Sequence, residues 1–247
     1  MRRTENIMDM PISLEIVDVD AQESDIQDIF TFFHQIDEQF SPFKSTSEVS
    51  RLNHGTLGKK DMSRDMQEIL ELCEKTKLET DGFFNICHGN IYDPSGLVKG
   101  WAIQQAAERL REKGFHHFFV DAGGDIQVSG KNAEGRTWRV GIRNPFNHEQ
   151  NIKILALDGK GIATSGTYSR GQHIYNPFSP DENLEKIISI SVIGPNVYEA
   201  DRFATAAFAM QENGIYFIES LPGFEAYAVG RNGVATATSA FDSYVTT

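Results

Sequence analysis

Apolar residues recur every three or four positions along several stretches of the chain, which is the spacing of an amphipathic helix. The first such stretch covers residues 22–40. Its apolar face consists of Ile26, Ile29, Phe30, Phe33 and Ile36. A second helix is expected over residues 63–78 with Ser63 as its cap, a third over residues 100–113, and a fourth over about residues 198–212.

Other stretches show the short apolar and alternating pattern of strands. Residues 118–120 and 126–128 are predicted to be two strands around a tight turn at Gly123-Gly124. Further strands are expected over residues 11–19, 137–142, 152–157, 172–175 and 186–193, and a last one after the turn Arg231-Asn232-Gly233. Because no Ser/Pro-rich linker divides the chain, we predict a single domain over residues 1–247. Its fold class is α+β (mixed α/β), with mixed sheets and packed helices.

The composition narrows the range of partners. The 247 residues are 40% hydrophobic, enough to bury a core, and no uncharged apolar run reaches the length of a membrane span. The net charge of -12 argues against nucleic acid or an anionic membrane as a partner. The first residues are charged and lead into no apolar signal core, and the spacing of Cys73 and Cys87 does not favour a disulfide. We expect a reduced, cytoplasmic protein.

A possible metal site lies in the segment Ala200–Ala206. On a helix, Asp201 and Thr205 are four residues apart and project from the same face. A carboxylate and a hydroxyl are hard oxygen ligands of the kind that Mg²⁺ prefers over the ligands of zinc. A solvated or capping pair has the same spacing, so the pair alone does not decide the matter.

A possible phosphate site lies in Tyr92–Ala102. There a Pro-Ser-Gly loop leads into a helix start, which exposes backbone amides and places Lys99 at the positive end of the helix dipole. A turn followed by an ordinary amphipathic helix, with Lys99 in solvent, is the interpretation that the segment alone favours, because many loops precede helices in this way. The segment alone does not exclude the phosphate site.

Two glycine-containing segments follow. Asp121-Ala122-Gly123-Gly124-Asp125 allows either a plain β-turn or the close approach of a ligand to the backbone. In residues 161–170, small hydroxyl residues and glycine after a strand suit a phosphate or the edge of a flavin ring. His173 follows shortly after and is a candidate general base, although a histidine on a strand is often structural.

The order of these segments resembles the signature of the ApbE-type family of magnesium-dependent FAD:protein FMN transferases. The signature consists of Asp-x-x-Gly-x-x-Lys-Gly-x-Ala, Gly-Gly-Asp, Ala-Thr-Ser-Gly-x-Tyr-x-Arg, His-Ile-x-x-Pro and Ala-Asp-x-x-x-Thr-Ala, all found here in that order. Upstream, Phe40-Ser41 and Ser47–Asn53 are also similar to family stretches, and Met10-Pro11 stands at its N-terminal strand entry. The likeness extends from about Met8 to Phe241.

This resemblance implies an ApbE/T-fold-like structure, Mg²⁺ as cofactor and FAD as substrate. It makes Asp201, Thr205 and the backbone carbonyl of Gly96 the metal ligands, and His173 and Asp201 the catalytic residues. The residues it implies for flavin nucleotide binding are Met10, Asp93, Lys99, Gly123, Gly124, Asp125, Thr164, Ser165, Gly166 and His173. It also implies the reaction, in which FMN passes from FAD to a threonine or serine of an acceptor protein and AMP leaves. The implied acceptor carries a motif of the type Asp-Gly-x-Ser/Thr-Gly/Ala-Ala-Thr.

Several departures and alternatives remain. The segment between Phe84 and Asp93 is shorter than in the family, Asn176 replaces an aspartate, and Gln104 stands where aspartate is frequent. One alternative is a FAD pyrophosphatase that releases FMN and AMP, which would need the same site. Two others are a non-catalytic flavin-binding protein and a purely structural domain. The stretch 232–238 faintly resembles the acceptor motif, which raises self-modification at Thr238, but a hairpin explains it better.

Overall fold

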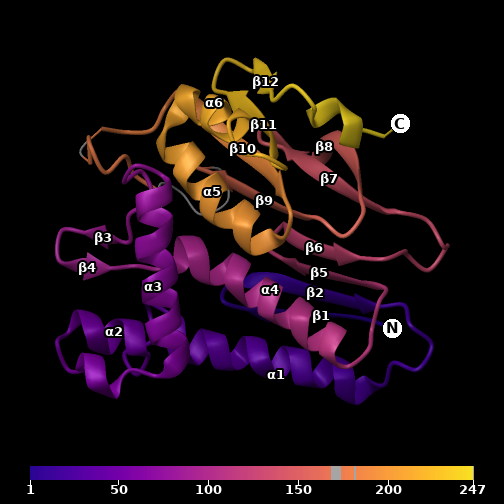
Figure 1. Cartoon of the computed structure of the whole chain (residues 1–247), viewed down its shortest axis with the longest axis horizontal. Coiled ribbons are helices and arrows are strands. Elements are labelled where there is room, and N and C mark those ends of the chain that lie inside the picture. The colour runs from indigo at the N-terminus through magenta and orange to yellow at the C-terminus, as the bar shows by residue number, and fades with distance from the viewer. Residues whose placement is uncertain (168–173, 181, 247) are drawn as a thin grey trace.

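The largest element of the fold is an antiparallel sheet of eight strands in the order β1-β2-β5-β6-β9-β10-β11-β12. The computed structural model describes residues 1–167, 174–180 and 182–246. In Figure 1 the sheet climbs from its N-terminal edge at the bottom to its C-terminal edge at the top. The strands are β1 Arg2–Ile7, β2 Met10–Ile16, β5 Phe118–Ala122, β6 Asp125–Ser129, β9 Gly161–Gly166, β10 Ile187–Gly194, β11 Glu225–Gly230 and β12 Ala235–Ala237.

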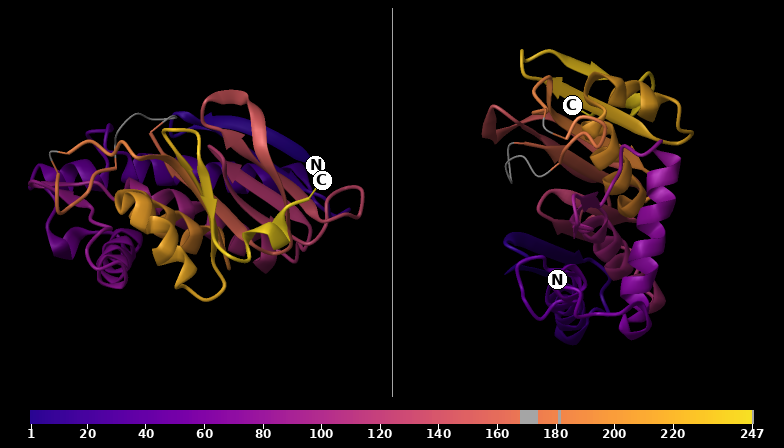
Figure 2. Two further views of the ribbon diagram at one scale, coloured as in Figure 1. Left: turned by 90° about the horizontal axis from the view of Figure 1, so that it is seen from above. Right: turned by 90° about the vertical axis from the view of Figure 1, so that its left-hand side faces the viewer.

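Helices cover one face of this sheet, as the two side views in Figure 2 show. They are α1 Glu23–Phe40, α2 Glu48–Asn53, α3 Arg64–Glu79, α4 Ser95–Glu112, α5 Val197–Ala209 and α6 Gly214–Glu219. Short 3₁₀ turns are η1 Lys59–Asp61, η2 Gln211–Asn213 and η3 Phe241–Tyr244. Two hairpins stand outside the large sheet, β3 Cys87–His88 with β4 Ile91–Tyr92, and β7 Trp138–Asn144 with β8 Asn147–Leu157.

The apolar stripe predicted on α1 is buried along its whole length. It packs in one core with α3, α4 and the alternate residues of β2 and β5. Phe30 and Phe33 are fully buried there, and each such side chain contributes about 1.5–3 kcal/mol relative to exposure. A second core lies between α5, α6 and strands β9 to β11. The helix face of the sheet is therefore filled by apolar packing on both halves of the molecule.

The β7–β8 hairpin covers part of the other sheet face. Alternate residues of β7, namely Trp138, Val140 and Ile142, are buried against the large sheet together with Leu155 and Phe241. Because side chains alternate along a strand, Arg139 and Arg143 point to the opposite side of the hairpin. This arrangement makes the hairpin a wall with one apolar and one polar face.

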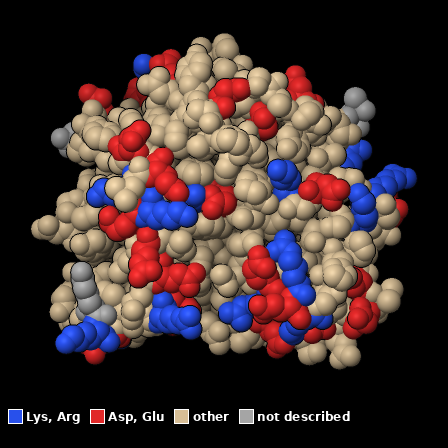
Figure 3. Space-filling view, viewed as in Figure 1, with Lys and Arg blue, Asp and Glu red and all other residues tan. Residues whose placement is uncertain are grey.

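The outer surface of the helix layer is ionic. Acidic and basic side chains are interspersed over this face (Figure 3), and several form exposed pairs such as Lys113 with Asp25 and Asp28 at 2.9 and 2.5 Å. Among the described residues, no helix combines the length and the apolar character that crossing a membrane requires. Cys73 is buried, which raises the pKa of its thiol, and Cys87 is half-buried; both are free thiols.

The predicted fold class is confirmed, and several predicted elements lie within a residue or two of those observed. Four elements differ by more: α4 begins at Ser95 rather than at Gly100, β8 begins at Asn147 rather than at residue 152, β2 ends at Ile16 rather than at residue 19, and α5 ends at Ala209 rather than at residue 212. The strand expected over residues 172–175 is wrong for Ile174 and Tyr175, which lie in no strand, while residues 172 and 173 lie outside the described residues. Residues 161–166 were expected after a strand but form the central strand β9.

Several elements were not predicted from the sequence, among them β1, α2, α6, the short hairpin β3–β4 and strand β11. Strand β1 was missed because five of its six residues are charged or polar; it lies at the sheet edge, where such residues face solvent. Helices α2 and α6 were missed because six residues give too few turns for a helical period to show. Strand β1 pairs with the next strand, β2, and α6 packs against its sequence neighbours α5 and β11.

Candidate active site

The centre of the site is a close contact between α4 and α5. Gly96 and Gly100 stand one turn apart on α4, opposite Thr205 and Asp201 one turn apart on α5. The Thr205 hydroxyl donates to the Gly96 carbonyl at 3.2 Å, and the Gly100 amide donates to Asp201 Oδ2 at 2.8 Å. A methyl group on Gly100 would lie 2.6 Å from Asp201 Cβ, so only glycine allows this approach. The two helices thus bring a hydroxyl, a carbonyl and a carboxylate together.

The Asp201 carboxylate is buried with only 2% of the residue exposed. Burial raises its pKa, and the Lys99 ammonium, 3.9 Å from Asp201 Oδ1, opposes that rise. Lys99 lies closer to a second buried carboxylate, with Nζ 2.6 Å from Asp125 Oδ2. Asp125 Oδ1 accepts the Thr164 amide at 2.9 Å. One lysine therefore serves two buried carboxylates from different elements, which leaves the centre acidic.

The sequence placed Lys99 at the positive end of the helix dipole, but in the structure it lies farther along α4. Because α4 begins at Ser95, Lys99 lies in the second turn. The first amides of the helix are already used, since the Ser95 amide donates to Asp93 Oδ1 at 3.0 Å and the Leu97 and Val98 amides to the Pro94 carbonyl. The Lys99 side chain is held at the junction of α4, α5 and β6, between Asp125 and Asp201.

A cavity of about 490 Å³ opens beside this centre. Most of the predicted site residues line it: Met10, Gly96, Lys99, Gly123, Gly124, Thr164, Ser165, Gly166, Asp201 and Thr205. Asp125 lies behind this lining, where it orients Lys99 and the Thr164 amide. Residues far apart in the sequence thus share one concave surface, contributed by β2, α4, the β5–β6 turn, β9 and α5.

The tips of two hairpins form one rim of the cavity. Gly123 and Gly124 have φ values of +63° and +99°, the left-handed conformation that glycine adopts without strain. The Gly123 amide donates to the Pro11 carbonyl at 3.1 Å, so the β1–β2 and β5–β6 turns are joined. Asp121 accepts the Gly124 amide at 2.8 Å, and burial raises the pKa of its carboxyl to about 6. The Gly-Gly segment is the tight turn that the sequence allowed, and it also lines the cavity.

The opposite wall was not predicted from the sequence. It is the polar face of the β7–β8 hairpin, where Arg139, Gly141, Arg143 and Asn151 line the cavity. The signal was present, since the arginines alternate with Trp138, Val140 and Ile142 and must face away from them. The sequence did not predict that the hairpin packs against this face of the large sheet.

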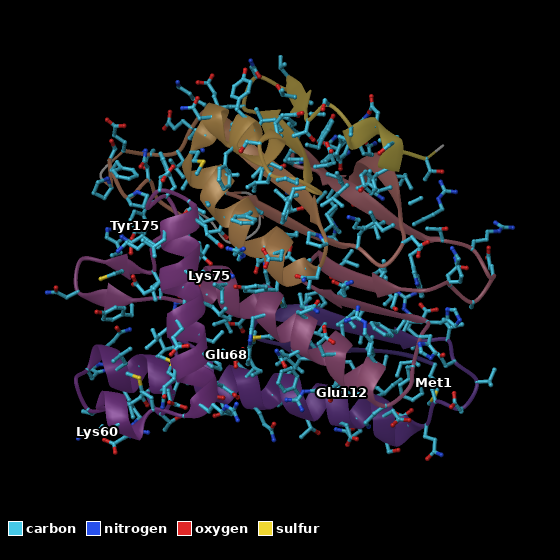
Figure 4. All side chains as sticks on the ribbon, in the orientation of Figure 1. Met1, Lys60, Glu68, Lys75, Glu112 and Tyr175 are labelled. Atoms are coloured by element: carbon cyan, nitrogen blue, oxygen red, sulfur yellow. The ribbon has the colours of Figure 1, made fainter. Side chains whose placement is uncertain are left out.

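A second cavity of about 460 Å³ meets the first at Ser95, Gly96, Ile174 and Thr205. Its lining is largely aromatic and apolar and includes Phe83, Phe84, Ile86, His88, Ile91, Asp93 and Tyr175. The rings of His88 and Tyr175 stack at 4.3 Å, and the Tyr175 hydroxyl donates to the Cys87 carbonyl at 2.8 Å. Figure 4 labels Tyr175 beside the upper end of α3. Among the predicted site residues, Asp93 lines only this second cavity, whereas Gly96 and Thr205 line both.

Two further predicted positions need comment. His173 lies outside the described residues. Thr238, considered as a site of self-modification, is 5% exposed, donates its hydroxyl proton to Glu225 and accepts the Ala226 amide at 2.8 Å. The stretch 232–238 folds as the β11–β12 hairpin, as the sequence favoured. A hydroxyl so engaged in the sheet is poorly placed to act as an acceptor.

The donor set at the centre fits a hard divalent cation. Within the described ranges, no group of three or more His, Cys, Asp or Glu side chains is placed to hold a metal ion. The oxygens of Asp201, Thr205 and the Gly96 carbonyl are of the type that Mg²⁺ takes while it keeps several waters and substrate oxygens. The buried acidic centre around Asp201 and Asp125 adds negative charge that a cation would offset.

The fold and site define a mixed α/β protein with an acidic, oxygen-lined centre between two cavities. The sequence profile of the ApbE family matches residues 8–94 and 91–228. The chain belongs to this family.

Similar proteins and similar solved structures carry names from the same family. The FAD:protein FMN transferases of Klebsiella pneumoniae and Haemophilus influenzae are each 28% identical to it, over 57% and 60% of this chain and 43% and 46% of their own length. The chain thus matches less than half the length of these curated relatives. The flavin transferase ApbE from Vibrio cholerae superposes with a TM-score of 0.86 at 20% identity, over 99% of this chain and 98% of that one. The ApbE protein from Thermotoga maritima gives a TM-score of 0.87 at 17% identity, over 100% and 99%.

Proposed function

We propose that this protein is a Mg²⁺-dependent transferase that moves FMN from FAD to a threonine or serine hydroxyl of an acceptor protein and releases AMP. The observation that carries the proposal is the meeting of two cavities at Gly96 and Thr205, beside Asp201 and Lys99. FAD has two aromatic ends joined by a pyrophosphate, which matches two cavities joined at a centre of oxygen donors and one lysine. The names of the relatives support the same reaction.

Asp201, Thr205 and the Gly96 carbonyl are the residues we assign to Mg²⁺. When bound, Mg²⁺ would neutralise the negative charge that builds up on the pyrophosphate oxygens as the bond breaks. Lys99 supplies a fixed positive charge at the same place, held by Asp125. The first cavity offers polar groups and two arginines to one half of FAD, and the second offers Phe83, Phe84 and Tyr175 to the other. The chain therefore contributes mainly positioning and electrostatics.

The atoms balance in a single in-line step. The acceptor hydroxyl oxygen bonds to the phosphorus on the riboflavin side, and the bond from that phosphorus to the bridging oxygen breaks. The hydroxyl proton passes to a base, for which we propose His173, and AMP leaves with the bridging oxygen. FMN stays joined to the acceptor through a phosphodiester. The same centre with water in place of the hydroxyl would give FMN and AMP.

The test is incubation of the protein with FAD, with and without Mg²⁺, and with a peptide of the acceptor type described above. Mass spectrometry should show the peptide heavier by one FMN, with AMP released in equal amount, only when Mg²⁺ is present. Asp201→Asn should reduce the rate by at least about 10²-fold, whereas the exposed control Asp20→Asn should not. Free FMN and AMP with an unmodified peptide would support the hydrolase instead. Intact FAD in every sample would exclude both reactions and leave a flavin-binding protein.

A further inference from the structure

The stretch Ser47–Asn53 is similar to the family signature, yet none of its residues lines either cavity. Asn53 is the last residue of α2 and makes an unusual contact. Its side-chain Nδ2 donates to the Tyr92 carbonyl at 2.9 Å, and its Oδ1 accepts the Tyr92 amide at 2.8 Å. A side-chain amide thus makes the pair of hydrogen bonds that a neighbouring strand would make with β4. The main chain of Tyr92 is fixed from both sides, because its other neighbour is Cys87 of β3.

From Tyr92 the chain runs directly into the proposed metal site. The Asp93 amide donates to the Ile86 carbonyl at 2.7 Å, and Asp93 Oδ1 accepts the Ser95 amide at 3.0 Å. Gly96 follows, and its carbonyl accepts the Thr205 hydroxyl at 3.2 Å. Only Asp93, Pro94 and Ser95 separate the residue held by Asn53 from the carbonyl assigned to Mg²⁺. A shift of Tyr92 would therefore be carried to Gly96 through a short, hydrogen-bonded segment.

Helix α2 is firmly supported. Ser47 caps it by accepting the Ser50 amide at 3.0 Å, and the Ser47 hydroxyl donates to the Ser41 carbonyl at 2.6 Å. Glu48 accepts the Ser63 amide at 2.8 Å and the Gln39 side-chain amide at 3.0 Å. These contacts tie α2 to the end of α1 and the start of α3. Asn53 therefore extends from a fixed support, about 40 residues before the segment it holds.

We propose that Asn53 is a positioning residue of the active site. Its amide holds the main chain of Tyr92 and thereby keeps the Gly96 carbonyl in place beside Thr205. This inference rests on the proposed function only for the role of Gly96 as a metal ligand. The clamp between Asn53 and Tyr92 is a property of the chain itself, so it is testable without metal or FAD.

The first measurement is hydrogen exchange of the metal-free protein, read by mass spectrometry on peptides that cover residues 90–98. Asn53→Ala removes both hydrogen bonds, and Asn53→Asp keeps the acceptor for the Tyr92 amide but loses the donor. We expect exchange in this segment to speed up by about tenfold or more in Asn53→Ala and by less in Asn53→Asp. Glu48→Ala is the matched control, because it also removes two hydrogen bonds of α2 but none near Tyr92.

The second measurement is the Mg²⁺ concentration that gives half-maximal FAD turnover. It should rise by about tenfold in Asn53→Ala, the lower end of what loss of a residue that orients a metal ligand costs. Glu48→Ala should lower the thermal midpoint and leave this Mg²⁺ concentration unchanged.

The outcomes separate the two proposals. Wild-type protein that consumes no FAD with Mg²⁺ contradicts the proposed function, while the exchange experiment still tests the clamp. Wild-type turnover combined with Asn53 variants that behave like Glu48→Ala in both measurements overturns the positioning role. If Asn53→Ala does not fold, unchanged exchange in Asn53→Asp is sufficient to refute the clamp.

Discussion

The close contact of α4 with α5 makes Gly100→Ala the most direct test of the site geometry. The added methyl group would lie 2.6 Å from Asp201 Cβ, 2.9 Å from Asp201 Oδ2 and 3.0 Å from the Val197 carbonyl oxygen. Carbon atoms in contact normally stand about 3.5–4.0 Å apart. The variant must therefore push α5 away by about 1 Å or turn Asp201 out of its place. Either change separates the carboxylate from the Gly100 amide that it accepts at 2.8 Å.

The expected loss of stability follows from two opposing effects. Overpacking of a filled interior costs about 1–3 kcal/mol. Alanine in a helix interior regains about 0.5–1 kcal/mol relative to glycine. The free energy of unfolding should therefore fall by about 1–2 kcal/mol, which lowers the thermal midpoint by about 2–8 °C for a domain of this size. Gly96→Ala should cost less, because its methyl group would lie 3.1 Å from the nearest atom, Thr205 Cγ2.

The assay is urea and thermal unfolding of both variants, followed by FAD turnover with Mg²⁺. Gly58→Ala is the matched control, since Gly58 is exposed with φ −82° and the nearest atom is the movable carboxylate of Asp61 at 3.2 Å. It should change stability by no more than about 0.5 kcal/mol. A Gly100→Ala protein as stable and as active as the wild type would refute the argument that these glycines set the site geometry.

Two further changes test charges around the site. Arg202 is almost fully buried, pairs with Glu199 and Glu79 and lies over the Phe203 ring. Arg202→Ala should therefore lower the free energy of unfolding by about 3 kcal/mol in urea, because it removes these contacts and leaves the half-buried Glu199 carboxylate without its partner; a loss below about 1 kcal/mol would contradict this. Burial raises the pKa of Asp121 from 3.8 to about 6 in the folded protein, so the unfolded chain ionises at lower pH than the folded one. The free energy of unfolding should therefore fall as pH rises from about 4 to about 6, by about 2 kcal/mol after allowance for partial exposure. Asp121→Asn should therefore lose less stability than the wild type between pH 4 and pH 7 in urea unfolding, and parallel pH profiles of the two proteins would exclude this role.

Most of the candidate site residues named from the sequence lie around one cavity, but some lie in a different local structure from the one expected. Asp201, Thr205 and Gly96 were placed together by resemblance, and the structure brings them into one centre. Lys99 was assigned to a helix end but lies inside α4, because Asp93 and Pro94 start the helix one turn earlier than the apolar period indicates. Short cap interactions of this kind leave little trace in a hydrophobic pattern.

The arginines of β7 show a different limit. Their alternation with apolar residues fixed which side of the strand they occupy, but not what that side faces. They line the cavity because the β7–β8 hairpin packs against the large sheet through Trp138 and Leu155. Such packing joins distant parts of the chain, and no local period encodes it.

By itself, the sequence determined the faces of the long helices, the turn at Gly123-Gly124 and the chemical types of the candidate ligands. These follow from backbone geometry and side-chain chemistry, which act over a few neighbouring residues. Only the tertiary structure decided that Gly100 meets Asp201, that Lys99 is shared with Asp125, and that Asn53 holds Tyr92. Those contacts depend on how the sheet and helices pack across long sequence separations, where steric fit and buried charge select one arrangement.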